Sequence, residues 1–232
     1  KRLGIVGKVD PMDGIVSVVG LKVLCKRIKV FLHPVVRCII HQQEQIGREV
    51  LSSVGRFARA FSSVDLQPVR SMWSIIDLAP LDVDVDERQE NLNDLVQALR
   101  EAGAEGTAQQ VIDFNEANRA KIKRVFRRLP RCVIQGDLND SNLLIADGRF
   151  VGLIDFNMAG TEVNINNFCC ETNRGVTEED FEKYTAAELF AEMRRRDREA
   201  LQVVLEQYEL NEDERSVIGN FRNLSMIAQF PN

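Results

Sequence analysis

Residues 133–156 constrain the fold of this chain more than any other stretch. They read VIQGDLNDSNLLIADGRFVGLIDF and contain two short runs of strand-forming residues, Leu143–Ile145 and Phe150–Ile154. The residues between these runs, 146–148, read Ala-Asp-Gly, which is typical of a tight turn. The sequence therefore predicts an antiparallel β-hairpin whose two open ends lie next to each other in space.

Acidic and amide side chains flank the open end of this predicted hairpin. Asp137 and Asn142 precede its first strand, and Asp155 closes its second. Because the tight turn brings the far ends of the strands together, we expect these three residues to converge. Each is an ordinary loop residue when taken singly. The agreement of spacing and predicted geometry favours a functional site, since Mg²⁺ prefers oxygen ligands and a carboxylate can accept the proton of a nearby hydroxyl.

An Asp, an Asn five residues later and a second Asp after a hairpin form the pattern used in phosphoryl transfer by kinases. Residues 129–170 resemble the aminoglycoside phosphotransferase and choline kinase superfamily, whose catalytic loop reads H-G-D-x-x-x-x-N and whose metal site reads I-D-F. The resemblance implies ATP and Mg²⁺ as cofactors. By this resemblance, Asp137 would orient the acceptor hydroxyl and take its proton, and Asn142 and Asp155 would hold magnesium.

The chain departs from the family pattern at several positions. Gln135 stands where the family has His, and we expect its amide to supply the hydrogen bonds with which that His supports the loop. Asn157 and Met158 follow Phe156, where relatives often carry Gly or an acid. Relatives often place an Asp at the start of a helix to brace the catalytic loop. The matching residue here is Asn167, which can still cap a helix but brings no charge.

The resemblance implies a protein-kinase-like, two-lobe α+β fold. Residues 1–44 are rich in Val, Ile and Gly, which favours strands, and would form a short N-terminal lobe that covers ATP. Five strands and one helix need about 60 residues, so we expect a lobe that is reduced or partial. Lys22 is the best placed candidate for the nucleotide phosphates, followed by Lys26 and Lys29, although a strand lysine that faces solvent is the simpler reading.

Residues 45–232 are expected to form a mainly helical C-terminal lobe that carries the hairpin 133–156. Apolar residues recur at helical spacing in several segments. The predicted helices are Gln45–Phe61, Glu87–Ala102, Gln109–Arg128, one that starts after Thr177 and runs to Tyr208 with a break near Arg194–Arg198, and Glu212–Phe230.

Composition narrows the function classes. The 232 residues are 44% hydrophobic and 28% charged, which suits a soluble globular protein. A net charge of −5 argues against a nucleic-acid partner. The sequence contains no apolar run of about 18 residues that could span a membrane, so we expect no membrane partner. Five cysteines without metal-ligand spacing suit reduced thiols, so we expect a cytoplasmic protein. The oligomeric state is not predicted.

Taken together, the sequence predicts a phosphotransferase that moves the γ-phosphoryl group of ATP to a hydroxyl of a small molecule. Amino sugars, choline-like alcohols and hydroxy amino acids all stay open as acceptors. The alternative is a nucleotide-binding scaffold or sensor with little or no transferase activity, which the short N-terminal region supports.

Two segments are secondary candidates for acceptor contacts. Acids at 82, 84, 86 and 87 could attract a cationic acceptor, although a solvated acidic turn is the simpler reading. Residues 161–173 are rich in amides and include Glu171, and family members form part of the acceptor pocket from this region. Loop and capping roles are the simpler reading for each of these amides.

Overall fold

The computed structural model describes residues 33–64, 68, 69, 71, 87–173 and 177–227. Lys22, Lys26, Lys29 and the acids at 82, 84 and 86 lie outside the described residues, as do the strands expected before residue 33. The chain falls into two units, residues 1–46 and 47–232. Only the first part of one helix is described in the first unit, so the second unit carries the fold below.

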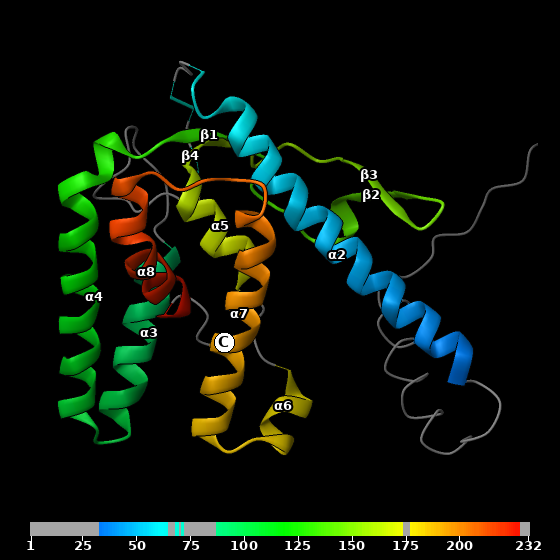
Figure 1. Ribbon diagram of the computed structural model, residues 1–232. Helices are drawn as coiled ribbons and strands as arrows, with labels where there is room; N and C mark the ends of the chain where they lie inside the picture. Colours follow the sequence, from blue (N-terminus) through cyan, green and yellow to red (C-terminus); the bar gives the residue numbers. More distant parts are fainter. Residues whose placement is uncertain (1–32, 65–67, 70, 72–86, 174–176, 228–232) are drawn as a thin grey trace, which may run out of the picture. The chain divides into compact units, whose positions relative to one another are not determined.

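The described residues are α+β and mostly helical, with a small antiparallel strand region (Figure 1). The two-lobe arrangement stays a prediction. In chain order the elements are α2 (His33–Phe61), α3 (Glu87–Glu101), α4 (Glu105–Val125), a 3₁₀ turn (Phe126–Arg128), β1 (Arg131–Ile134), a second 3₁₀ turn (Asp140–Asn142), β2 (Leu143–Ala146), β3 (Arg149–Leu153), β4 (Gly160–Val163), α5 (Asn164–Thr172), α6 (Glu178–Lys183), α7 (Ala186–Leu205) and α8 (Glu212–Ile227).

The predicted hairpin is confirmed as β2 and β3, which pair antiparallel. Its turn residues Asp147 and Gly148 have φ angles of 49° and 71°, so this two-residue turn needs the left-handed conformation that Asp and Gly accept. Leu144 pairs with Gly152, but the next pair skips Val151. This bulge changes which side chains of β3 point to each face of the hairpin.

The two faces of the hairpin have different surroundings. Because of the bulge, Phe150 and Leu153 share the face that lines a cavity of the protein. Leu144 pairs with Gly152, and Ile154 follows Gly152 by two residues, so Leu144 and Ile154 lie on the opposite face, where both are exposed.

Helix α2 holds the hairpin in place. The carboxylate of Glu49 accepts a hydrogen bond from the Phe150 backbone N–H at 2.9 Å and forms an ion pair with Arg149. Farther along α2, Gly55 lies so close to α7 that a Cβ there would sit 2.3 Å from the Val204 carbonyl oxygen. Glycine at this position therefore permits the close approach of α2 and α7.

Helix α5 runs through the main hydrophobic core and packs against α7 and α8 (Figure 1). Its Ile165 and Phe168 are fully buried beside Ile122 of α4 and Phe221 of α8. The Phe168 ring meets the edge of the Tyr208 ring with centroids 5.1 Å apart, a favourable aromatic geometry. Strand β4 leads directly into α5, so the core fixes the segment that follows the hairpin.

The first helix is longer than the sequence predicted. Strand-like composition was expected up to residue 44, but α2 already begins at His33. Pro34 suits the first turn of a helix, where its missing N–H costs no hydrogen bond. The β-branched residues that follow it have only a weak strand preference, and helical context overrides such preferences.

The break in the C-terminal helical segment also lies elsewhere than predicted. It falls at Tyr184, between α6 and α7, and α7 runs unbroken through Arg194–Arg198. Thr177 caps the Asp180 N–H and begins α6, and Thr185 caps the Glu188 N–H and begins α7, each in a complete capping box. The second capping box starts a new helix.

The remaining helices match the predictions more closely. Helix α3 ends one residue earlier than predicted, and α4 begins at Glu105 rather than at Gln109, with an acid in its first turn that suits the helix dipole. Helix α8 begins at Glu212 as predicted, with the Asn211 side chain accepting from the Glu214 N–H. Among the described helices, none is long and apolar enough to cross a membrane.

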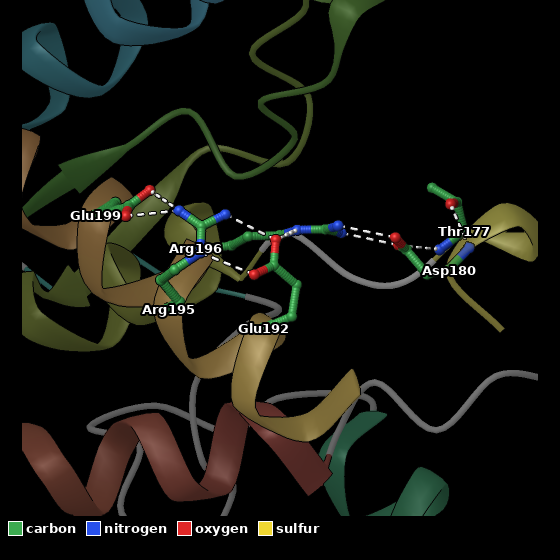
Figure 2. A network of polar contacts seen from close by, with 6 residues as sticks. All are labelled: Thr177, Asp180, Glu192, Arg195, Arg196 and Glu199. Atoms are coloured by element: carbon green, nitrogen blue, oxygen red, sulfur yellow. Dashed lines mark hydrogen bonds and ion pairs between the residues drawn. The ribbon is translucent and has the colours of Figure 1, made fainter. Parts of the chain in front are cut away.

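Two arginines of α7 organise an ion-pair network (Figure 2). Arg196 donates two hydrogen bonds of 2.8 Å to Asp180 of α6 and one of 2.9 Å to Glu192. Arg195 bridges Glu192 and Glu199 at helical spacing, which supports the helix through the arginine run. The network thus joins the short helix α6 to α7.

The network lowers the pKa values of its carboxylates. Hydrogen bonds from Arg196, followed by those from Thr177, hold the pKa of Asp180 well below its usual range. Hydrogen bonds from Arg195 and Arg196 lower the pKa of Glu192 to about 2. A carboxyl whose pKa is lowered by folding stabilises the folded state above its unfolded pKa, and this contribution is lost as the pH falls through the folded pKa.

Asp180→Asn should therefore destabilise the protein at pH 7 through loss of the Arg196 ion pair. The gap in urea midpoint between wild type and variant should narrow as the pH falls below about 4, because Asp180 becomes protonated in the unfolded wild-type chain first. Urea titrations at several pH values measure this gap. Glu199→Gln, which removes an exposed pair with Arg195, is the control and should change the midpoint little. A gap that stays constant with pH would contradict the expectation.

Candidate active site

Two amide groups hold the carboxylate of Asp137. Its Oδ1 accepts from Asn139 Nδ2 at 2.8 Å, and its Oδ2 accepts from Asn142 Nδ2 at 2.9 Å. The same Asn142 nitrogen donates to the Asp137 backbone carbonyl at 2.8 Å. Asn142 is buried and Asp137 is half-buried. The orientation of the Asp137 carboxylate is therefore fixed before any substrate binds.

Gln135 links this loop to the end of the hairpin. Its Oε1 accepts from the Asp137 N–H at 2.8 Å, while its Nε2 donates to the carbonyls of Asp155 at 2.6 Å and Ile154 at 3.2 Å. The Ile154 N–H in turn donates to the Asn142 carbonyl at 3.0 Å. The structure therefore brings the main chains of the three predicted residues together. The expectation that an amide can replace the family's His as a support is confirmed.

The backbone of the site takes two left-handed conformations. Gly136 has a φ of 85°, and a Cβ there would lie 2.2 Å from the Met158 carbonyl oxygen. Asp155 has a φ of 57°, which is uncommon for a residue other than glycine. The hydrogen bond from Gln135 to the Asp155 carbonyl helps to hold this conformation.

Two of the predicted residues, Asn142 and Asp155, carry oxygen atoms suited to a hard cation. Both hydrogen bonds of the Asn142 side chain use Nδ2, which leaves Oδ1 for coordination. The Asp155 side chain is exposed, and its Oδ1 meets the Asn157 N–H only at 3.4 Å. Within the described residues, no group of three or more His, Cys, Asp or Glu could hold a metal ion. One amide and one carboxylate nevertheless fit Mg²⁺, which usually takes one or two carboxylates together with substrate phosphates.

A cavity of about 330 Å³ lies next to the loop that carries Asp137. Residues from α2, β1, the loop, the hairpin and α5 line it: Ser53, Val54, Phe57, Cys132, Val133, Ile134, Gln135, Gly136, Leu138, Phe150, Gly152, Leu153, Phe156, Asn167 and Glu171. Asp137, Asn142 and Asp155 do not line it, although their chain neighbours do.

Some polar side chains of the amide-rich segment after the hairpin join core elements, and others line this cavity. Asn164 is buried and donates to the Tyr208 hydroxyl at 3.2 Å, and Asn173 donates to the Ser225 carbonyl at 2.8 Å, so both join core elements. Asn167 and Glu171 line the cavity instead. The proposed capping role of Asn167 is wrong, because α5 begins at Asn164 and Asn167 lies one turn inside it.

Sequence reasoning missed Asn139. The segment DLNDSN contains two asparagines, and only Asn142 matches the family spacing. Asn139 accepts from the Ser141 N–H at 3.0 Å while donating to Asp137, so it turns the loop and orients the carboxylate together. An Asn two residues after the candidate base, followed by Ser two residues later, is the turn signal that could have identified it.

Gln135→Leu should lower the free energy of unfolding by about 1–3 kcal/mol, because it leaves the partly buried Asp137 N–H and the carbonyls of Ile154 and Asp155 without their partner. Urea unfolding measures the loss. Gln135→His, which keeps one donor and one acceptor, should recover part of it. Gln97→Leu is the matched control, since Gln97 is exposed and makes one exposed hydrogen bond. Equal losses for Gln135→Leu and Gln97→Leu would show that the hydrogen bonds of the Gln135 side chain add nothing to stability.

Comparison with known proteins supports the resemblance that the loop suggested. The family model described as the phosphotransferase enzyme family matches residues 35–162, which is more than half of the chain and includes Asp137, Asn142 and Asp155. Comparisons with curated proteins and with solved structures gave no match. The chain therefore belongs to the phosphotransferase enzyme family, within the aminoglycoside phosphotransferase and protein-kinase-like superfamily.

Proposed function

We propose that this phosphotransferase moves the γ-phosphoryl group of ATP, with Mg²⁺, to a hydroxyl group of a small molecule. The observation that carries the proposal is the Asp137 carboxylate, which the amides of Asn139 and Asn142 orient. Gln135 also joins the main chain of Asp137 to the main chain of Asp155. An oriented carboxylate beside a loop with cation ligands is the arrangement that phosphoryl transfer to an alcohol requires.

Asp137 serves as the base in this proposal. A carboxylate offers about four lone-pair sites. Asp137 can therefore accept a hydrogen bond from the hydroxyl of the substrate in addition to those from Asn139 and Asn142. The proton of the hydroxyl passes to Asp137 while the hydroxyl oxygen bonds to the γ-phosphorus. The bond from this phosphorus to the β,γ-bridging oxygen breaks, and ADP leaves with the electron pair.

Asn142 and Asp155 hold Mg²⁺ in this proposal, through Asn142 Oδ1 and the exposed Asp155 carboxylate. When bound, the ion neutralises negative charge on the phosphates. Asn142 would have two roles, because its nitrogen orients Asp137 and its oxygen would be available to hold the cation. This links the position of the base to the position of the metal ligand.

The outer face of the hairpin suits an adenine base. Leu144 and Ile154 are 44% and 45% exposed, and they lie on the same face, two residues after Asn142 and one residue before Asp155. A flat apolar ring placed on them would bury apolar surface and keep the phosphates near the proposed metal ligands. Lys22, which we predict to meet the phosphates, lies outside the described residues and stays a prediction.

The three acceptor classes considered from the sequence all stay open: amino sugars, choline-like alcohols and hydroxy amino acids. We propose no nucleic-acid partner and no membrane partner. A cytoplasmic location is part of the proposal, and the free cysteines 132, 169 and 170 are consistent with it.

A turnover assay tests the proposal. ADP formation from ATP and Mg²⁺ is measured with a panel of small alcohols from the three acceptor classes, and a phosphorylated product is identified by mass spectrometry. At least one acceptor should give a product in equal amount to ADP. Binding of ATP and Mg²⁺ by the folded chain without product from any acceptor would instead support the nucleotide-binding scaffold or sensor.

Asp137→Asn should lower kcat about 10²–10⁴-fold, because the amide cannot take the proton of the acceptor. The Kd for ATP with Mg²⁺ should change little, since Asp137 does not hold the nucleotide in this proposal. Turnover rates and calorimetric ATP binding measure the two effects. Asp140→Asn is the matched control, because Asp140 is an exposed acid of the same loop with no role in the proposal.

Asp155→Asn should weaken Mg²⁺ and ATP binding together, with a Kd for ATP in the presence of Mg²⁺ raised at least about tenfold. In the absence of Mg²⁺ the Kd of the variant should be no higher than that of the wild type, because the lost attraction passes through the cation and the lost carboxylate otherwise repels the phosphates. Titrations with and without Mg²⁺ measure this difference. Equal weakening in both conditions would remove Asp155 from the metal site.

A further inference from the structure

Both oxygens of the Asp137 carboxylate accept a hydrogen bond, and this restricts the rotation of the group. A carboxylate turns readily about the bond between Cβ and Cγ, because this torsion has broad minima. Here Asn139 Nδ2 donates to Oδ1 at 2.8 Å and Asn142 Nδ2 donates to Oδ2 at 2.9 Å. Rotation of the carboxylate would break both bonds. The lone pairs that a substrate can use therefore keep fixed directions.

The two donors differ in how firmly the protein holds them. Asn142 is buried, and its Nδ2 also donates to the Asp137 carbonyl at 2.8 Å. Asn139 is exposed, so water competes for its amide. The alignment of Asn139 with the carboxylate must therefore depend on the other contacts of its side chain.

Ser141 supplies these contacts. Its backbone N–H donates to Asn139 Oδ1 at 3.0 Å, and its hydroxyl donates to the same oxygen. A backbone N–H can only donate, so the atom of the Asn139 amide that faces it must be the oxygen. The nitrogen of the amide is then left to face Asp137. Ser141 thus determines which end of the Asn139 amide meets the carboxylate.

These bonds form a series in which Ser141 donates to Asn139 and Asn139 donates to Asp137. Hydrogen bonds in series polarise one another, so donors on the amide oxygen make the amide N–H a better donor. The last bond of the series ends on a carboxylate, and such charge-assisted bonds are the stronger kind. The hydroxyl of Ser141 therefore strengthens the contact between Asn139 and Asp137 without touching Asp137.

We propose that Ser141 is a positioning residue for phosphoryl transfer, which acts on the base Asp137 through the amide of Asn139. The hydroxyl keeps the amide aligned, and the amide keeps the carboxylate aimed at the acceptor hydroxyl. This inference rests on the proposed function, because that function makes Asp137 the base. A base that is free to turn spends less time in the orientation that the reaction needs, and turnover slows.

The same contacts also cap a short turn. Asn139 is the N-cap of the 3₁₀ turn Asp140–Asn142. A cap stabilises the loop whatever Asp137 does, so a residue with this role alone would affect stability and, through Asn142, the binding of ATP with Mg²⁺. A positioning residue changes the turnover of bound substrates instead. Measurements of kcat and of the Kd for ATP on the same variants separate the two roles.

Ser141→Ala removes the hydroxyl donor and keeps the N–H donor. The kcat should fall about three- to tenfold, while the Kd for ATP with Mg²⁺ should change less than about twofold. Ser141→Thr keeps a hydroxyl and should restore kcat to within about twofold of the wild type. Ser216→Ala is the matched control, because the Ser216 hydroxyl is an exposed donor to the Asp213 carbonyl at 2.7 Å, and it should leave kcat unchanged. An unchanged kcat in Ser141→Ala, or a fall that Ser141→Thr does not restore, would overturn the proposal.

A double-mutant cycle shows whether Ser141 acts through Asp137. In the Asp137→Asn background, Ser141→Ala should have no further effect on the residual kcat, because the base that it positions is gone. The same fold-change in both backgrounds would mean that Ser141 acts elsewhere, and the proposal would be refuted.

The contact between Asn139 and Asp137 has a test that needs no turnover. Asn139→Asp places a second carboxylate against Asp137 and should lower the urea midpoint at pH 7 by about 0.3 M or more. Adding Asp137→Asn exchanges the donor and the acceptor between the two positions, so the hydrogen bond can form in the opposite direction. This double variant should recover most of the loss. Asn139→Asp combined with Asp140→Asn has the same net charge and should recover less than half of it.

The outcomes distinguish this proposal from the proposed function. Equal recovery in the two double variants, or recovery in neither, would remove the contact on which Ser141 depends and would overturn the proposal. Recovery specific to the exchange of Asn139 with Asp137, together with no product from any acceptor, would confirm the contact and refute the proposed function instead.

Discussion

The candidate site depends on one side-chain amide that joins two separate segments of chain. Gln135 accepts from the Asp137 N–H and donates to the Asp155 carbonyl, so the proposed base and the proposed metal ligand share one support. Gln135 is only 7% exposed, so water cannot easily replace its hydrogen bonds. Gly136 completes this junction, because its missing side chain lets the loop lie against Met158.

The local chemistry of the hairpin could be predicted from the sequence because its signals are short-range. The Asp147-Gly148 turn and the two strand runs lie within a few residues of one another, and pairing of the strands places Asn142 and Asp155 at the same end. Asn139 was missed because its function depends on where its amide points, and spacing alone does not show this. The roles of the site residues stay predictions until turnover and binding are measured.

Helix boundaries were less predictable because they depend on capping and tertiary packing. Thr185 starts α7 by capping Glu188, a signal that a run of arginines farther along obscured. Asn167 was expected to begin a helix, but α5 starts three residues earlier, directly after β4. That small displacement moves Asn167 from a helix end to the cavity wall, where it shares a face with Glu171.

Helix α5 therefore serves two purposes with its two sides. Ile165 and Phe168 bury one side in the core, which fixes the helix, while Asn167 and Glu171 face the cavity from the other. A helix so firmly packed holds its polar residues at constant positions along the cavity wall.

The exchange of His for Gln at position 135 has a consequence for pH dependence. A histidine has an unperturbed pKa near 6.5, so a loop supported by histidine can lose a hydrogen-bond acceptor when the ring gains a proton. The amide of Gln135 does not titrate, and its acceptor for the Asp137 N–H therefore persists across the physiological range. The support that Gln135 gives to the loop therefore does not change with pH near neutrality.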